Sequence, residues 1–423
     1  MKKKPQTGQS TLKAKTGSFI ILPMLPAGRD CSFRRIAGRL SIDTPDISLN
    51  VLEALNREGY VMECRKLSAE DVNRGMFGVR EDYNLILDGR EEDRLELGDI
   101  FIFEFHTGIV LVGVSILYSR MEMLQRICYP GYVKENCRYS LRSEKEEILL
   151  EDRLKEWLGS LGLLPFYEDS PLFLEAFVHN IAVVPERFRK MKEITEITFN
   201  MHQMAPLGQP VTDASEEDVG YVYAVKDQVL GSYRWGCCIS SQTISYVICD
   251  ETMDLKREME TESKDTLPVV MLALYEKYTC LYFDRLLAEG SQKRVREIRE
   301  LRRRMLEFRA YGTVAPSSLS RWYNIRMIYK CLVEYFGVPE VLGEIDSKLE
   351  ILSNAQKEIE DKRRDILVDA ITFFGLISIL DSVLSIYAAL SVGTMGMLRL
   401  FLICVAAFAV IFAAVILFVR HYR

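Results

Sequence analysis

The chain ends in AITFFGLISILDSVLSIYAALSV (residues 370–392) and LFLICVAAFAVIFAAVILFV (residues 400–419), and these two apolar stretches decide its fold. At a rise of about 1.5 Å per residue they correspond to helices of about 35 and 30 Å, and the hydrocarbon core of a bilayer is about 30 Å thick. The sequence therefore predicts a C-terminal membrane hairpin. Asp381 lies inside the first stretch, where an ionisable side chain is costly and indicates a functional site.

Positive charge indicates how the hairpin lies in the membrane. Basic residues precede the first stretch and follow the second, whereas the connecting segment has only Arg399 near its end. Such residues are enriched on the cytoplasmic side. We therefore expect a multi-pass protein of the inner (cell) membrane, with both termini in the cytoplasm and a tight external turn over residues 393–398. The flanking basic residues are Lys362, Arg363, Arg364, Arg420 and Arg423.

The composition ahead of the hairpin is that of a soluble protein. With 423 residues, 27% of them charged, the chain has room for about two or three domains. A net charge of -6 gives no overall attraction to nucleic acid, so we expect no direct nucleic-acid partner. Ten cysteines without CxxC spacing and only four histidines argue against zinc and indicate reduced cytoplasmic thiols.

Patterning divides the chain into four parts. Residues 1–16 form a basic tail without the apolar segment of a secretory signal, and we expect this tail to be disordered. Residues 17–255 mix β-like runs with helical periodicity and predict an α+β or α/β cytoplasmic domain. Residues 256–365, rich in Leu, Glu, Lys and Arg, predict a helical stalk. Residues 366–423 hold the transmembrane hairpin.

The same patterns predict individual elements. Residues 100–105 and 109–117 are expected to be strands joined into a hairpin at His106-Thr107-Gly108. Further strands are expected at residues 18–24, at 60–64 and within 233–249. Helices are expected at residues 49–58, 145–161, 267–288, 292–310 and 318–336. A last helix is expected to run from about Pro339 to Leu390, on the order of 75 Å, because no proline or glycine lies between Gly343 and Gly375.

One face of that last helix is hydrophilic in the stalk and polar or small inside the membrane. At about 100° per residue, its membrane part falls within about ±60° of Ser378. The members of this stripe are Gly375, Ser378, Asp381, Ser382, Ser385 and Ala389. Such a stripe packs closely on another helix or lines a water-filled path. Asp381 favours the path, because the second stretch has no basic residue or histidine to pair with it. Several copies of the first helix would then form a pore.

The order of these parts resembles the CorA-like (2-TM-GxN-type) cation channel superfamily: a cytoplasmic α/β domain, a helical stalk, two C-terminal spans, a short external loop and a basic end. In that family the first span lines a pentameric pore and ends at a Gly-Met-Asn signature that selects hydrated magnesium. This chain has Gly396 and Met397 but Leu398 where asparagine would stand. The resemblance therefore implies a homopentamer, and the departure puts magnesium selectivity in doubt. Divergent CorA-like proteins without the signature also serve antiviral systems, including type III CRISPR loci, where a nucleotide messenger binds the cytoplasmic part.

Two basic clusters are candidates for binding a nucleotide or another small anion, because guanidinium groups bind phosphates well. The clusters are Arg34 with Arg35, and Arg296, Arg299 and Arg303. Glutamates interleaved with the second cluster leave open the alternative of a salt-bridged, solvated helix face.

No catalytic motif stands out, and the chain is not expected to be an enzyme. GxxxxGK[ST], GxGxxG, HExxH and GxSxG are all absent. Cys237 and Cys238 lie in a β-rich run, which is typical of a buried strand rather than of a nucleophile. Magnesium or another divalent cation could bind at a subunit contact to an acidic stretch, or that stretch is simply a charged loop; its members are Glu91, Glu92, Asp93, Glu96 and Asp99. Apart from such a cation and a nucleotide ligand, the sequence indicates no cofactor.

Three functions stay open. The first is a CorA-like homo-oligomeric channel gated by a ligand of its cytoplasmic domain, a divergent effector opened by a nucleotide messenger in antiviral defence. The second is a transporter of magnesium or another divalent cation. The third is a non-conducting, membrane-anchored scaffold that binds a ligand.

Overall fold

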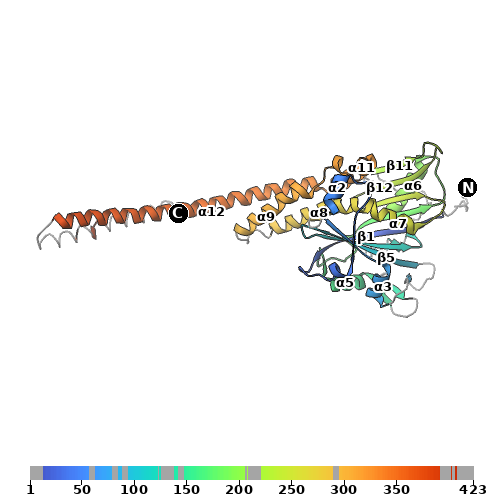
Figure 1. Ribbon diagram of the computed structural model, residues 1–423, viewed down its shortest axis with the longest axis horizontal. Helices are drawn as coiled ribbons and strands as arrows, with labels where there is room; N and C mark the ends of the chain where they lie inside the picture. Colours follow the sequence, from blue (N-terminus) through green and yellow to red (C-terminus); the bar gives the residue numbers. More distant parts are fainter. Residues whose placement is uncertain are drawn as a thin grey trace, which may run out of the picture. The chain divides into compact units, whose positions relative to one another are not determined.

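The computed structural model describes residues 13–56, 62–78, 84–87, 94–121, 123–124, 138–141, 147–204, 207, 221–288, 295–390, 402 and 405–406. Over these residues the fold is mixed α+β, as predicted, with a sheet domain and a long C-terminal helix (Figure 1). The chain forms two compact units, Met1–Ser347 and Lys348–Arg423.

One 13-stranded sheet is the framework of the first unit. Its main path has the order β11-β12-β13-β10-β1-β6-β5-β4-β7-β8, while β3 pairs with β2 and β5, and β9 pairs with β1. Among the described strands only β10 and β13 pair in parallel. The strands are β1 (Lys15–Pro26), β2 (Gly38–Leu40), β3 (Met62–Leu67), β4 (Asn84–Leu87), β5 (Arg94–Phe105), β6 (Val110–Tyr118), β7 (Arg138–Leu141), β8 (Glu147–Leu149), β9 (Leu163–Pro165), β10 (Phe177–Val184), β11 (Tyr221–Lys226), β12 (Tyr233–Ile239) and β13 (Thr243–Cys249).

The predicted hairpin forms the centre of the sheet together with β1. β5 and β6 pair antiparallel, and β6 pairs in turn with β1. Gly108 has a φ of 91°, a conformation that glycine adopts without steric penalty. The N–H of Phe105 donates to the carbonyl of Ile109 at 2.9 Å and closes the turn. The prediction of two strands joined at residues 106–108 is confirmed.

Helices cover both faces of this sheet. Those of the first unit are α1 (Phe33–Ile36), α2 (Leu49–Asn56), α3 (Ala69–Phe77), α5 (Leu150–Ser160), α6 (Met191–His202), α7 (Leu255–Lys264), α8 (Thr266–Ala288), α9 (Val295–Glu307), a π-helical turn (Phe308–Gly312), α10 (Pro316–Leu319) and α11 (Tyr323–Tyr335). α3, α5 and α6 share one apolar core with the side of β1 that carries Ile20, Leu22 and Met24.

α7 and α8 pack on the opposite face, where two glycines let them approach the strands closely. A Cβ on Gly17 of β1 would lie 2.5 Å from Sδ of Met259 in α7. A Cβ on Gly113 of β6 would lie 2.9 Å from Cε of Met271 in α8. The sheet therefore lies between two helical layers, and α11 packs on α8 in the second of them.

Two predicted helices differ from the observed ones. The helix expected over residues 318–336 is two helices, α10 and α11, because Ser320 and Trp322 between them have extended backbone. The helix expected from residue 145 begins only at Leu150, since Glu147–Leu149 pairs as a strand with β7. Local apolar periodicity did not distinguish these short extended segments from helix.

The second unit contains most of α12 (Val338–Leu390). The 53 residues of this helix confirm the prediction of one continuous helix to Leu390. Among the described residues, Val338–Ser385 is a span long and apolar enough to cross a membrane, by length and composition alone. None of its most apolar window is buried, unlike that of a core helix. Residues 393–398 and most of the second predicted span lie outside the described residues, although Leu402, Val405 and Ala406 are helical.

Candidate functional site

The polar stripe of α12 is a candidate site because it places an ionisable residue, Asp381, in the apolar part of this helix. Gly375, Ser378, Asp381, Ser382 and Ser385 are all exposed in the single chain. They belong to one regular helix, so the rotation of about 100° per residue keeps them in one sector. The carboxylate of Asp381 makes no ion pair with any residue that the structure describes. α12 therefore brings five of the six predicted stripe residues together.

Two details modify the stripe. The hydroxyl of Ser382 donates to the carbonyl of Ser378 at 2.8 Å, so this serine satisfies its donor within its own helix. Phe374 is exposed and lies about 40° from Ser378 by the same rotation. Its phenyl group is therefore in the same sector of the helix, one turn before Ser378. Sequence reasoning missed Phe374, although its spacing of four from Ser378 was visible. Ala389 is helical but its side chain is outside the description, and Gly396, Met397 and Leu398 lie outside the described residues.

The stripe is surrounded by apolar side chains on the rest of the helix. Exposed apolar residues of this segment are Ile371, Phe374, Leu376, Ile379, Val383 and Tyr387. Contiguous exposed apolar side chains of this kind mark an interaction surface, and lipid or other helices are neighbours that would cover it. The helix thus combines an exposed carboxylate, Asp381, with exposed apolar side chains.

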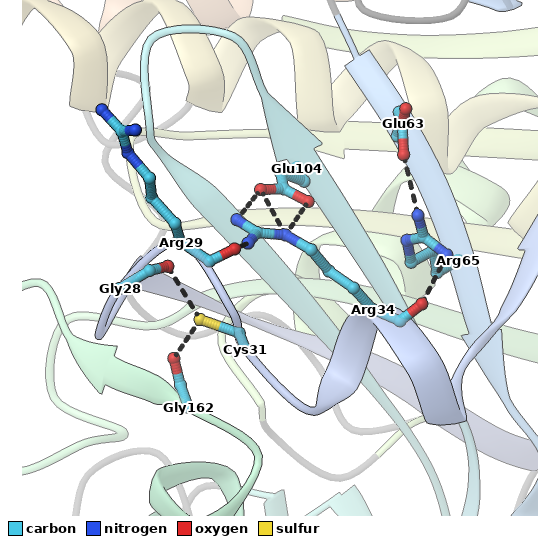
Figure 2. Close-up of polar contacts among 8 residues, drawn as sticks. All are labelled: Gly28, Arg29, Cys31, Arg34, Glu63, Arg65, Glu104 and Gly162. Carbon is cyan, nitrogen blue, oxygen red and sulfur yellow. Dashed lines mark hydrogen bonds and ion pairs between the residues drawn. The ribbon is translucent and has the colours of Figure 1, made fainter.

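Arg34, the first of the candidate anion-binding residues, is held by a carboxylate. Its Nε donates to Oε1 and Oε2 of Glu104 at 3.1 and 3.0 Å, and its Nη2 forms an ion pair with the same group (Figure 2). The hydrogen bond to Glu104 raises the pKa of Arg34 above its ordinary value, against the effect of burial. Nη1 of Arg65 donates to the carbonyl of Arg34 at 3.0 Å, and Cys31 donates its thiol to Gly162 at 3.2 Å. Contacts with distant parts of the chain therefore hold the loop around α1 in place.

The other arginine candidates are also paired where their side chains are described. Arg35 forms an exposed ion pair with Asp30 at 2.6 Å. Arg303 of α9 donates from Nη2 to Glu300 at 2.7 Å and pairs with Glu307 one turn on. Arg299 has an interaction partner, and the side chain of Arg296 is outside the description. The pairs of Arg303 agree with the alternative prediction for this cluster, a salt-bridged helix face formed with the interleaved glutamates.

Two carboxylates of the acidic stretch are also paired with lysine side chains. Glu96 accepts from Nζ of Lys256 at 2.7 Å, and Asp99 pairs with Nζ of Lys66 at 2.6 Å. The described residues contain no group of three His, Cys, Asp or Glu side chains that could hold a metal ion. Glu91, Glu92 and Asp93 of that stretch lie outside the description.

Buried ionisable groups are the features that sequence reasoning missed. Glu276 of α8 accepts hydrogen bonds from the hydroxyl of Tyr329 and, at 3.3 Å, from the N–H of Val314. Burial raises its pKa to about 7, although these hydrogen bonds oppose the shift. Burial also raises the pKa of the Cys238 thiol to about 12 and that of Cys237 well above its ordinary value, so neither is a ready nucleophile.

Comparisons with protein-family models, with curated proteins and with solved structures gave no match to this chain.

Proposed function

We propose that the chain is a homo-oligomeric ion channel of CorA-like build in the inner membrane, a pentamer whose cytoplasmic domain opens the pore when a nucleotide messenger binds. One observation carries the proposal: the exposed stripe around Asp381 on a helix long and apolar enough to cross a membrane.

The stripe supports an oligomer because a single copy leaves Asp381 without a favourable environment. A carboxylate at the centre of a bilayer costs about 3 kcal/mol or more unless it has water or a partner. Copies of α12 that face one another with this stripe provide a water-filled path, and their remaining faces meet lipid or the second span. Phe374 then forms an apolar ring next to the polar residues, and such a ring can gate a pore by excluding water.

The paired arginines suggest how a nucleotide would act. A phosphate that binds Arg34 must displace Glu104, since the guanidinium already contacts both carboxylate oxygens. Replacement of Glu104 by a phosphate would release this carboxylate of β5 and loosen the loop at α1. Ligand binding would therefore change the conformation of the cytoplasmic domain.

The competing function is the non-conducting scaffold, and the bond from Ser382 to Ser378 is compatible with it. A serine that is satisfied inside its own helix suits close helix packing as well as it suits a pore. In the scaffold, Asp381 would have no role in ion flow.

Ion flux into liposomes that contain the purified full-length protein tests the proposal. We expect flux in the presence of a nucleotide ligand, and a reduction of about ten-fold in Asp381→Asn, because the charge that attracts cations into the pore is lost. Asp369→Asn is the matched control: Asp369 lies on the same helix, about 180° from Ser378 by rotation, and should leave flux within about two-fold. The same flux measurement with magnesium in place of the nucleotide tests the transporter: flux that responds to magnesium and not to the nucleotide would favour it. Absence of flux with every ligand, together with a monomer in detergent, would favour the scaffold.

A further inference from the structure

A cavity of about 470 Å³ opens in the first unit, on the α7 side of the sheet. Strands β11 to β13, helix α7 and the first turn of α11 all contribute to its walls. Its volume is in the range that accommodates a small organic molecule. The ionisable residues that line it are Asp46, Arg234, Tyr246, Cys249, Asp250, Arg257, Glu258, Glu262 and Asp265.

Two buried polar side chains in the wall each have an oxygen atom without a well-formed hydrogen bond. Oε2 of Glu262 and the hydroxyl of Tyr246 are shielded from water, and the side chain of Thr266 interacts with both groups without forming a well-aligned hydrogen bond to either of these two atoms. Glu262 is only 9% exposed and Tyr246 only 1%. An unsatisfied buried group of this kind costs about 1 to 3 kcal/mol of desolvation, which Thr266 offsets only in part. A ligand that offers donors to both would recover this energy after a small rotation of the two side chains toward the cavity.

The cavity is lined by more acidic than basic side chains. Five carboxyl groups face two guanidinium groups in its lining. Burial raises the pKa of Glu262 to about 8, and the neighbouring Asp265, Asp46 and Glu258 add to the shift while Thr266 opposes it. The pKa values of Asp46 and Glu258 are raised as well, by burial first and by nearby carboxylates second. Carboxyl groups that repel one another in this way are stabilised by an added cation.

An aromatic wall completes the cavity. Trp235 and Tyr246 meet edge to face, with ring centroids 4.9 Å apart and planes at 63°. Both line the cavity. Aromatic faces attract ammonium groups and also contact methylene groups.

A metal ion does not fit this arrangement. The described residues include no three carboxylates close enough to share one ion, here or elsewhere. The carboxyl groups are instead spread over the walls of a cavity far larger than a metal ion. Several carboxyl groups around one cavity, together with its aromatic residues, suit a ligand that carries more than one positive group on an apolar chain.

We propose that this cavity binds an aliphatic diamine or polyamine, with one ammonium group donating to Glu262 and Tyr246, a second near Asp46 and Asp265, and the methylene chain against Trp235. This inference goes beyond the proposed channel function, because the site lies within the Met1–Ser347 unit and binding does not depend on ion flow.

Isothermal titration of the full-length protein in detergent with spermidine tests the proposal. We expect a Kd of about 100 μM or tighter, weakened about ten-fold in Glu262→Gln, which keeps the shape of the side chain but removes its charge. Asp46→Asn is a second variant, at a residue in a loop rather than in α7, and should also weaken binding. Glu260→Gln is the matched control, since Glu260 lies on α7 and pairs with Lys264 at the exposed surface.

The pH dependence of binding gives an independent readout. Because a cation stabilises the ionised form of Glu262, binding should release a proton and tighten as the pH rises toward about 8. The proposal is overturned if spermidine does not bind at about 1 mM, if Glu262→Gln binds it like the wild type, or if magnesium chloride displaces it at equal concentration. Since these are binding measurements, a protein that fails to conduct ions can still satisfy them, and a conducting channel can fail them.

Discussion

At the scale of single residues, Glu276 makes the stability of the first unit depend on pH. Its folded-state pKa is raised from 4.5 to about 7, so the folded protein holds this proton more tightly than the unfolded chain does. The stabilising effect of the protonated form is complete below about pH 4.5 and is lost as the pH rises to about 7. A charged, buried Glu276 therefore weakens the protein above neutrality.

Glu276→Gln should remove that dependence. Glutamine keeps an oxygen that accepts from Tyr329 and Val314 and carries no charge. We expect the variant to be more stable than the wild type by about 3 kcal/mol at about pH 8, and nearly equal to it at about pH 5. Tryptophan fluorescence reports the change, because all three tryptophans, Trp157, Trp235 and Trp322, lie in the first unit.

Glu334→Gln serves as the control for Glu276. Glu334 lies at the exposed end of α11 and pairs with Lys330 at 3.6 Å, an exposed contact of little energetic value. Its replacement should change stability by less than about 0.5 kcal/mol at either pH. Equal gains for both glutamine variants would show that burial of Glu276 is not the cause.

At the scale of elements, the contact between α3 and α5 depends on one glycine. A Cβ on Gly75 of α3 would lie 2.3 Å from Nε1 of Trp157 in α5, so Gly75→Ala must push the indole or the helix aside. We expect a loss of about 1 to 3 kcal/mol, despite the better helix propensity of alanine. Gly159→Ala in α5 meets nothing within 4 Å and should gain about 0.5 to 1 kcal/mol. Urea unfolding midpoints of the two variants should therefore shift in opposite directions, and shifts of the same sign would contradict this packing.

Elements with a local signature were predictable from the sequence, and elements whose stability depends on distant partners were not. The β5–β6 hairpin and α12 follow from turn residues and from uninterrupted helix formers, both of which are local. β10 was missed because His179 and Asn180 interrupt its apolar run. In the folded protein, Asn180 accepts from the hydroxyl of Ser18 at 2.6 Å, a partner 162 residues away. No local pattern indicates that contact.

The same distinction applies to the candidate sites. The stripe on α12 is a matter of helical period, and the pairing of Arg303 with Glu300 and Glu307 is a matter of spacing along one helix, so both were open to sequence reasoning. The pairing of Arg34 with Glu104 joins α1 to β5, and the cavity at Glu262 is assembled from strands and helices that are far apart in the chain. Such sites exist only after the sheet and its helical layers have formed.

At the scale of the whole molecule, the boundary between the two units lies within α12 rather than before it. Val338 and Ile345, in the first turns of the helix, are 2% and 1% exposed. Asp346 forms an ion pair with Arg309, which lies in the π-helical turn after α9. The start of α12 therefore belongs to the core of the first unit, and its stability is expected to depend on these residues.

Two truncated chains test this division. A chain that ends at Ser347 should fold in water without detergent, since it keeps Val338, Ile345 and Asp346 and lacks the apolar surface of the second unit. A chain that ends at Phe336 loses the burial of a valine and an isoleucine and should be less stable by about 3 kcal/mol or more. Tryptophan fluorescence in urea measures both, and the shorter chain should unfold at a lower urea concentration. Equal midpoints would mean that the first turns of α12 add nothing to the core, and aggregation of the longer chain would mean that the first unit needs the membrane helix in order to fold.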